Sequence, residues 1–393
     1  MTQNSAGHLL GLIRSGKART RGELQHLTGL SRSTIGQRVD RLIDAGYLRM
    51  PGVDESTGGR PPTLLEFNDQ HAVVLAADLG ATHASLAVLD LAGRPLAEHR
   101  ADRRIADGPQ PVLDWVARRF TALLAEAGHQ PTEVCGLGLG VPGPVEFDIG
   151  RVRQPPIMPG WDDYPIAEHL QRTFPVPVLV DNDANLMALG EHVAHHRDCP
   201  AMVLVKVATG IGAGVVVGGS VYRGIDGGAG DLGHIRLHGH EQARCMCGSY
   251  GCLAAVASGS ALAGRLAALG VPTESSRQLL DRIAAGHPEA CRLAREAGQL
   301  VGEVLATVVC LLNPGVLVIA GDLAETHFVT GVREMLYQRA LPRATRHLTV
   351  TTSQLGGQAG VLGAHAMVVE SVYAPDMVDR RLTTPAGSTA ARP

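Results

Sequence analysis

Two stretches of the chain share one pattern. Residues 73–89 read VVLAADLGATHASLAVL, and residues 202–217 read MVLVKVATGIGAGVVV. Each begins with an apolar run of strand length, passes through a loop of small residues with threonine, and returns as a second apolar run before a tight turn, at Ala92-Gly93 or Gly218-Gly219. Because the same succession occurs twice, the sequence indicates an internal duplication of one α/β unit.

Other segments extend this α/β pattern. Further apolar runs of strand length cover 134–141, 178–180 and 316–320, and helical patterns cover 111–127 and 299–312. Two such α/β halves that face a cleft form the bodies of sugar kinases and of actin-like ATPases. The sequence therefore predicts a duplicated, two-lobed α/β body of this kind.

The first 67 residues have a different pattern. A short helical stripe covers 5–15, and Thr20 and Glu23 have the spacing of a capping box at the start of a second helix. Ser31 is placed to cap a third helix, and a region rich in glycine and proline then leads to 63–67. Three helices followed by a small β-wing are the order of a winged helix-turn-helix, so we expect a DNA-binding head.

The domain boundaries follow from these patterns. We expect the winged helix-turn-helix over 1–67, a first α/β lobe over 68–184 and a second lobe over 185–373, whose final helix can return to the first lobe. Residues 374–393 are rich in proline, threonine, alanine and serine, which predicts a disordered tail.

The third helix of the head is the candidate recognition helix. Its early polar side chains lie opposite its apolar stripe, where a helix in the major groove would meet base edges. These candidate DNA-binding residues are Ser31, Arg32, Ser33, Thr34, Gln37 and Arg38. Arg60, within a Gly-Gly-Arg-Pro-Pro stretch, is a candidate for the minor groove. The alternatives are an ordinary solvated helix face and, for Arg60, a plain linker.

Charge separates the head from the rest of the chain. Residues 1–65 carry nine basic and five acidic side chains, a net charge of +4. Because the whole chain has a net charge of −3, the remaining residues have a net charge of −7. A basic head on an acidic body favours double-stranded DNA as a partner, although a solvated surface would show the same balance. No apolar run is long enough to span a membrane without charge or glycine, so we expect a cytoplasmic protein without membrane contact.

Four residues have the composition of a structural zinc site. Cys245, Cys247 and Cys252 lie within eight residues, and His234 lies eleven residues before the first of them. One imidazole and three thiolates fill the tetrahedral shell of zinc and leave no position open for catalysis. The alternatives are a disulfide with one spare thiol, or three reduced and buried thiols.

From about residue 5 to about residue 370 the sequence resembles the ROK family of repressors and sugar kinases, most specifically in the run CMCGSYGC over 245–252 with His234 upstream. The winged helix is similar to that of the family's repressors, since its kinases usually lack one. The resemblance implies a ROK repressor with a structural zinc ion. It also implies that the repressor acts as a homodimer or homotetramer.

The resemblance also assigns the glycine-rich loops. Asp78-Leu79-Gly80-Ala81-Thr82 and Thr209-Gly210-Ile211-Gly212 match the two phosphate loops of the sugar-kinase and actin superfamily. In a kinase Gly80, Gly210 and Gly212 would give backbone access, Thr82 and Thr209 hydroxyls, and Asp78 a seat for Mg²⁺. A repressor can keep these loops as remnants because the turns need glycine.

The resemblance places the effector site beside the zinc. Asn182 and Asp183 match a family stretch whose aspartate is the general base in kinases, and Asp183 is also a candidate helix N-cap. Asp231 and Ala254 stand where family kinases read sugar with glutamates, and His234 completes the set. A sugar hydroxyl that loses a charged acceptor loses about 1.5–3 kcal/mol. We therefore expect weaker hexose binding or a different ligand.

These observations favour a transcriptional regulator, and we expect a repressor whose operator binding is controlled by a sugar or sugar derivative in the cleft. We expect no catalytic residue and no enzyme activity. One alternative is an ATP-dependent, glucokinase-like sugar kinase that uses ATP and Mg²⁺ with Asp183 as base, alone or as a second activity. A third is a constitutive DNA-binding protein with a vestigial pocket.

Overall fold

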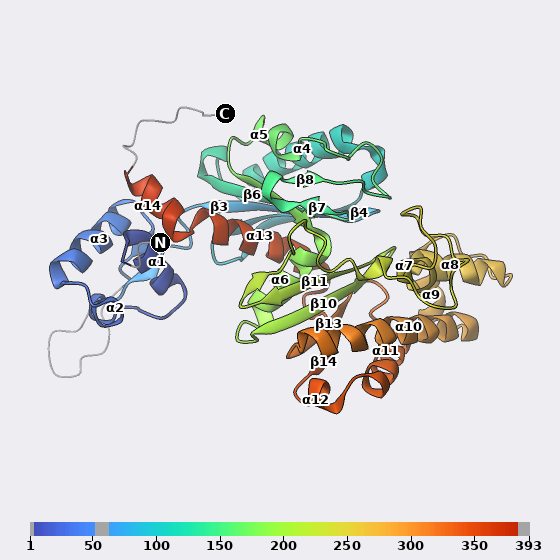
Figure 1. Ribbon diagram of the computed structural model, residues 1–393. Coiled ribbons are helices and arrows are strands. Elements are labelled where there is room, and N and C mark those ends of the chain that lie inside the picture. The colour runs from blue at the N-terminus through green and yellow to red at the C-terminus, as the bar shows by residue number, and fades with distance from the viewer. Residues whose placement is uncertain (1–3, 52–62, 384–393) are drawn as a thin grey trace.

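The computed structural model describes residues 4–51 and 63–383 of the chain. Over these residues the protein consists of a small helical head beside a larger body that is built on two five-stranded sheets (Figure 1). The body has one sheet in each of two lobes, and two helices run between the sheets. This arrangement confirms the two-lobed α/β fold with an N-terminal helix-turn-helix.

The first sheet is built around a central strand, β3 (Val73–Leu79), whose seven residues are all buried. It is antiparallel to β4 (His83–Asp90) and parallel to β6 (Val134–Val141). In sheet order the strands are β5 (Pro95–Asp102), β4 (His83–Asp90), β3 (Val73–Leu79), β6 (Val134–Val141) and β9 (Val178–Asn182). A two-stranded ribbon of β7 (Val145–Glu146) and β8 (Arg151–Val152) adjoins this lobe.

The second sheet repeats this topology strand by strand. Its central strand, β10 (Ala201–Val207), is antiparallel to β11 (Ile211–Val217) and parallel to β13 (Val316–Ala320). In the first sheet β3 pairs with β4 and β6 in the same way. In sheet order the strands are β12 (Ser220–Val221), β11 (Ile211–Val217), β10 (Ala201–Val207), β13 (Val316–Ala320) and β14 (Thr349–Thr352). The duplication that the two sequence stretches predict is therefore present.

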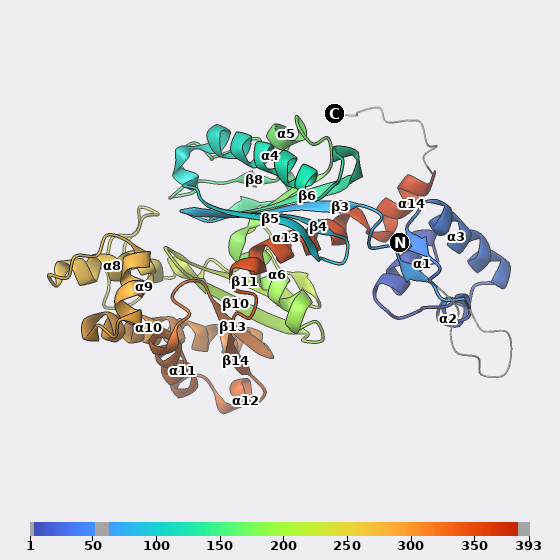
Figure 2. The same cartoon turned by 180° about the vertical axis from the view of Figure 1, so that it is seen from behind.

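Helices cover the outer faces of both sheets. In the first lobe, α4 (Pro109–Glu126) and α5 (Ile166–Gln171) share one apolar core with the sheet (Figure 2). In the second lobe, the long pair α10 (Pro288–Leu312) and α11 (Thr326–Arg339) cover the sheet. Four shorter helices complete that lobe: α7 (Leu253–Ala257), α8 (Gly259–Ala268), α9 (Ser276–Ala284) and α12 (Pro342–Thr345).

Two helices fill the space between the sheets. α6 (Asp183–His195) and α13 (Ala359–Val372) share an apolar core with the inner faces of both sheets. Their backbones come very close, since a Cβ atom at Gly363 would lie 1.8 Å from the carbonyl oxygen of Leu186. Only glycine permits such an approach, so the two helices form one closely packed pair at the centre of the body.

The head has the winged helix-turn-helix order. Thr20 and Glu23 form the expected capping box, and Gly29 ends the second helix at φ +68°. Its elements are α1 (Ala6–Arg14), α2 (Arg21–Thr28), α3 (Arg32–Asp44), β1 (Leu48–Arg49) and β2 (Glu66–Phe67). Residues 52–62, which include Arg60 and its Gly-Pro-rich stretch, lie outside the described residues.

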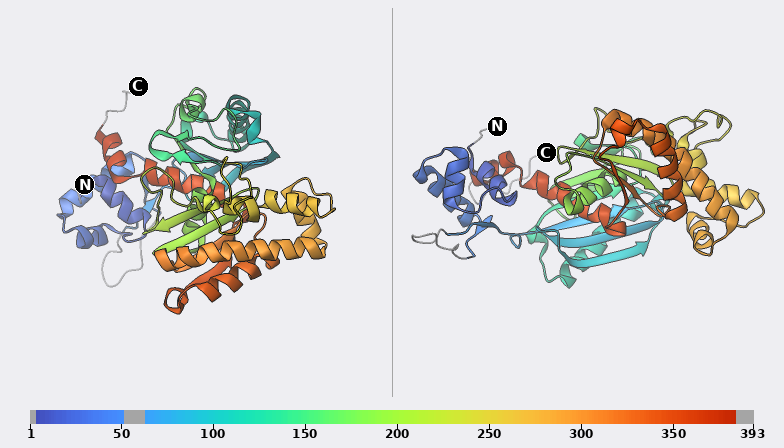
Figure 3. Two further views of the ribbon diagram at one scale, coloured as in Figure 1. Left: turned by 45° about the vertical axis from the view of Figure 1, so that its right-hand side comes forward. Right: turned by 90° about the horizontal axis from the view of Figure 1, so that it is seen from below.

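The C-terminal helices join the head to the body. The apolar core of the head includes Val368, Val369 and Val372 from the end of α13, and Val378 from α14 (Pro375–Thr383). Both views of Figure 3 show α14 beside the head. The expected disordered tail from residue 374 is therefore wrong for Pro375–Thr383, because burial of Val378 stabilises a helix whose composition otherwise suggests disorder. Residues 384–393 lie outside the described residues.

Among the described residues, no helix combines the length and the apolar character that crossing a membrane requires.

Candidate effector and metal sites

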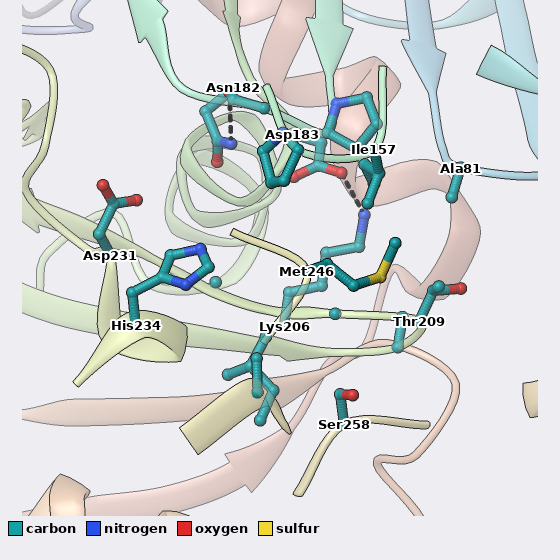
Figure 4. A pocket seen from close by; sticks show the side chains of 18 of the residues that line it. Ala81, Ile157, Asn182, Asp183, Lys206, Thr209, Asp231, His234, Met246 and Ser258 are labelled. Atoms are coloured by element: carbon teal, nitrogen blue, oxygen red, sulfur yellow. Dashed lines mark hydrogen bonds and ion pairs between the residues drawn. The ribbon is translucent and has the colours of Figure 1, made fainter. Parts of the chain in front are cut away.

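A cavity of about 410 Å³ lies between the two lobes, within the range of about 300–1,000 Å³ usual for small-molecule sites. Asn182 and Asp183 line it from the first lobe, and Asp231 and His234 line it from the second (Figure 4). Ala254 also lines it from the second lobe. The structure thus brings all the sequence-predicted effector residues to one cavity. Ala254 contributes no polar group to the wall.

Asn182 positions the start of α6. Its side-chain oxygen accepts hydrogen bonds from the backbone N–H groups of Ala184 and Asn185, and its amide donates to the carbonyl oxygen of Gly143 at 3.0 Å. Asn182 is therefore the N-cap, and the interpretation of Asp183 as the cap is wrong. Asp183 occupies the first helical position, where the positive end of the helix dipole favours a carboxylate.

Asp183 forms a buried ion pair that the sequence analysis missed. Lys206 Nζ donates to Asp183 Oδ2 at 2.6 Å, and the two side chains are only 15% and 7% exposed. Burial alone would lower the pKa of Lys206, but the carboxylates of Asp183, Asp78 and Asp322 outweigh it and raise this pKa above its ordinary value. The detectable signal was a single lysine within the apolar run of residues 202–207.

Asp78 borders a cavity but is largely buried, with only 7% of the residue exposed. Its Oδ1 atom is buried without a hydrogen-bond partner in the described part of the chain, and burial raises the pKa of its carboxyl. The wall behind it is tight, because a Cβ atom at Gly360 would lie 2.3 Å from Asp78 Oδ2. The end of this side chain is thus wedged between β3 and the start of α13.

The two glycine-rich loops border the first cavity and a second, larger cavity of about 1,270 Å³ that adjoins it. Asp78 lines the larger cavity, Gly210 and Gly212 line the first, and Thr82 and Thr209 line both. Gly80 lies in a tight turn and donates its N–H to the carbonyl oxygen of His83 at 2.8 Å. Thr209 and Lys206 border both cavities, so the two spaces meet at the carboxyl end of β10.

The four predicted metal ligands converge on one point. The ligand atoms of His234, Cys245, Cys247 and Cys252 all lie within 4.8 Å of one another. Cys247 and Cys252 are 3.8 Å apart at their sulfur atoms, and Cys245 Sγ lies 3.7 Å from His234 Nδ1. Two thiolates about 2.3 Å from a tetrahedral zinc ion lie about 3.8 Å apart, so this donor set fits zinc.

The candidate metal ligands lie on the same backbone segments as residues that line the cavity. His234 ends a single helical turn, Leu232–His234, that begins directly after Asp231. On the other side, Cys252 is the N-cap residue of α7, which carries Ala254. An ion at the cluster would therefore fix two walls of the cavity at once, because its ligands flank both Asp231 and Ala254.

The predicted recognition residues lie at the start of α3. Ser31 caps this helix by accepting a hydrogen bond from Thr34 N–H, while Arg32, Ser33 and Gln37 are exposed. Arg38 is half-buried, and its Nη1 atom has no hydrogen-bond partner among the described residues. Arg32 is accordingly the arginine of this set that projects most freely from the helix.

A second ion pair joins the lobes. Arg223, which follows β12 in the second lobe, lies 2.7 Å from the Oδ2 atom of Asp181 at the end of β9 in the first. Its guanidinium also lies 3.7 Å from the ring centre of Phe147. Neither contact was predicted from the sequence, because the partners are far apart along the chain.

A winged helix-turn-helix head on a sugar-kinase-like body defines a class of DNA-binding regulators. The ROK family profile matches residues 74–371, which comprise most of the body. The chain belongs to the ROK family.

Similar proteins of this family include regulators and kinases. The chain is 29% identical to a xylose repressor of Caldicellulosiruptor bescii, over 93% of this chain and 95% of the repressor. The crystal structure of a ROK family transcriptional regulator, a homologue of the E. coli Mlc protein, matches with a TM-score of 0.82 at 26% identity, covering 97% of this chain and 99% of that one. A ROK hexokinase from Thermus thermophilus matches with a TM-score of 0.63 at 32% identity, covering 77% of this chain and 99% of that one.

The difference in coverage separates the two groups. The regulator matches almost the whole chain, whereas the hexokinase matches over its own full length and still leaves part of this chain uncovered. The chain is therefore built as a transcriptional regulator of the family.

Proposed function

We propose that the protein is a sugar-responsive repressor that binds an operator through α3 and releases it when a sugar or sugar derivative fills the cleft. Asn182, Asp183 and Asp231 supply polar contacts for ligand hydroxyls at the cavity wall. Arg32 and its polar neighbours on α3 contact the major groove. Arg60, outside the described residues, remains a candidate for the minor groove.

One observation supports the link between ligand and DNA. The first turn of α13 packs against Asp78 beside the cleft at Gly360. The last turns of the helix place Val368, Val369 and Val372 in the apolar core of the head. A change in the angle between the lobes is therefore transmitted to the head by a single packed helix. In a homodimer or homotetramer, such a movement would alter the spacing of two recognition helices and weaken operator binding.

Zinc has a structural role in this proposal. His234, Cys245, Cys247 and Cys252 complete its coordination shell, so the ion has no open position for chemistry. It holds the turn that carries Asp231 against the start of α7.

The decisive test starts from unknown DNA. Purified protein selects binding sites from a random pool, and the selected duplex is then titrated with D-xylose, D-glucose and N-acetylglucosamine. We expect one enriched motif with half-sites about one helical turn apart, and release by at least one sugar. Failure to enrich any motif contradicts the regulator; a motif that no sugar releases contradicts the sugar effector.

Two parallel measurements distinguish the alternatives. A coupled ATPase assay with the same sugars reports kinase activity, which we expect to be far below the usual range of about 1–100 s⁻¹. Thermal unfolding without DNA reports ligand binding alone, because a ligand that binds only the folded state raises the melting temperature. A sugar that raises the melting temperature without turnover supports a binding pocket over a kinase site and over a vestigial one.

Arg32 provides the sharpest test of the recognition surface. Arg32→Ala should weaken binding to the selected operator by about 1–3 kcal/mol if this side chain contacts a guanine, and should relax sequence preference at that base. The control is Lys17→Ala, which removes an exposed charge of the head outside α3. Binding assays at fixed salt that give the same loss for both variants would show that only overall charge matters.

A further inference from the structure

Lys206 occupies the junction between the effector cavity and the larger loop cavity. Lys206 borders both cavities, and so does Asp322, which follows β13. Asp183 lines the effector cavity, and Asp78 lines the larger cavity. A cation thus sits where three carboxylates from three separate segments of the chain face one region. In a sugar kinase this region would hold the divalent cation that accompanies ATP.

The residues present do not fit a divalent cation. Lys206 Nζ is bonded to Asp183 Oδ2 at 2.6 Å in a largely buried position, so one carboxylate that could face a metal already has a positive partner. Asp78 borders the larger cavity, but its Oδ1 atom is buried and has no hydrogen-bond partner among the described residues, so this oxygen is not presented to an ion. An added ion of charge +2 would also repel the ammonium group, and at a few ångströms this repulsion is only weakly screened inside a protein.

We propose that Lys206 is a built-in cation that replaces the divalent metal of the kinase reaction and fixes Asp183 as a ligand-orienting acceptor. One carboxylate oxygen of Asp183 is held by Lys206, and the side chain lines the cavity where the other oxygen can accept a ligand hydroxyl. Lys206 has further N–H donors, so the pair can also bind an acceptor oxygen of the ligand. Lys206 is thus a specificity-determining residue of the pocket.

This assignment explains how a kinase-like cleft becomes a receptor. A general base must have an oxygen free to reach the attacking hydroxyl, whereas one oxygen of Asp183 is already held by Lys206. The same ion pair is well suited to binding, because it presents a fixed acceptor and fixed donors without needing a nucleotide. The inference rests on the proposed function only in that both place the ligand in this cleft.

The test is a titration with Mn²⁺ followed by electron paramagnetic resonance, on protein whose cysteine cluster is loaded with zinc. We expect wild-type protein to bind no stoichiometric Mn²⁺ in the cleft, with or without ATP. Lys206→Met removes the cation and leaves the carboxylates free, so this variant should bind Mn²⁺ at least about tenfold more tightly than wild type. The matched control is Lys17→Met at the other lysine of the chain, which is exposed on the head.

A charge-balanced variant separates this effect from loss of folding. Lys206→Met combined with Asp183→Asn removes both members of the pair, so it should fold and should not gain the Mn²⁺ site. The proposal is overturned if wild-type protein binds stoichiometric Mn²⁺ and Asp78→Asn abolishes this binding. It is also overturned if the Lys206→Met variant folds but binds Mn²⁺ no more tightly than wild type. The wild-type measurement decides the matter even if Lys206→Met fails to fold. Release of the operator by sugar, which tests the proposed function, is measured separately from Mn²⁺ binding, which tests the role of Lys206. Either of the two proposals can therefore fail while the other holds.

Discussion

At the scale of single residues, the cavity is controlled by groups that already have partners. Asp183 is held by Lys206, and the helical turn that directly follows Asp231 ends at His234, a candidate metal ligand. A ligand therefore meets side chains whose positions are set before it arrives, which lowers the entropy cost of binding. The Ala254 side chain, which also lines the cavity, offers no hydrogen-bond acceptor to a ligand.

Removal of one thiolate tests the metal site. Cys247→Ser should reduce the zinc content from about one ion per chain, lower the melting temperature, and weaken the response to the effector because the cavity wall is no longer fixed. Elemental analysis and thermal unfolding measure the first two effects, and operator release measures the third.

The matched control for this variant is Cys310→Ser, an exposed cysteine on α10 outside the cluster, which should leave all three readouts unchanged. A folded wild-type protein without metal would contradict the zinc assignment.

At the scale of elements, the contact between α1 and α14 ties the head to the body. Gly7 N–H donates to Asp379 Oδ1 at 2.8 Å, and a Cβ atom at Gly7 would lie 2.1 Å from the carbonyl oxygen of Pro375. α1 can approach the start of α14 this closely only because position 7 has no side chain.

A pair of glycine substitutions in one helix tests this contact. Gly7→Ala should destabilise the protein by about 1–3 kcal/mol through overpacking against backbone. Gly11→Ala, on the same helix with open space around it, should instead stabilise by about 0.5–1 kcal/mol through helix propensity. Urea unfolding of both variants gives the comparison, and equal effects would show that α14 does not pack as described.

A buried histidine makes α13 sensitive to acid. His365 Nε2 lies 2.8 Å from the carbonyl oxygen of Asp90, and burial lowers the pKa of His365. The unfolded chain, in which this pKa is about 6.5, therefore binds the proton more readily than the folded one. Stability from this group is complete above about pH 6.5 and is lost as the pH falls below that value, at up to about 1.4 kcal/mol per pH unit.

The variant His365→Gln keeps a side-chain amide as donor but cannot titrate. Its loss of unfolding free energy between pH 7.5 and pH 5.5 should be smaller than that of wild type. Some acid sensitivity should persist, because the pKa values of His71 and His196 are also lowered, chiefly by burial. Identical pH profiles for the variant and wild type would assign the acid sensitivity to other groups.

At the scale of the whole molecule, the two lobes are joined by more than the helix pair between their sheets. The bond from Arg223 to Asp181 crosses from one lobe to the other, and the Asp181 side chain is only 1% exposed. Asp181 also accepts a hydrogen bond from the Asn185 amide at 2.9 Å. This buried network is thus in a position to set the angle between the lobes.

Arg223→Ala should weaken that link. Loss of a hydrogen-bonded cation beside a buried carboxylate should lower the unfolding free energy by about 1.5–3 kcal/mol. Arg153→Ala removes an arginine whose ion pairs, with Glu146 and Asp163, are exposed and lie within one lobe, so little change is expected. Urea denaturation measures both, and equal losses would argue against a special role for the connection between lobes.

Local chemistry accounts for what the sequence determined by itself. Apolar runs of strand length predicted β6 and β13 with their full bounds, and Thr20, Glu23 and Ser31 marked helix starts through caps that act within a few residues. The spacing of His234 and the three cysteines predicted a cluster because ligand geometry is set largely within one loop. These features depend on neighbours in the chain, so they are readable without a fold.

Only the tertiary structure decided the features that depend on distant partners. β5 (Pro95–Asp102) has a mixed polar pattern and is a strand because β4 supplies its hydrogen bonds. α14 is a helix because it packs against α1, and Asp183 is an ion-paired carboxylate because β10 brings Lys206 beside it from 23 positions along the chain. Burial and charge pairing arise from contacts between segments that are distant in the chain. The sequence shows which residues are present, but only the fold shows which of them are in contact.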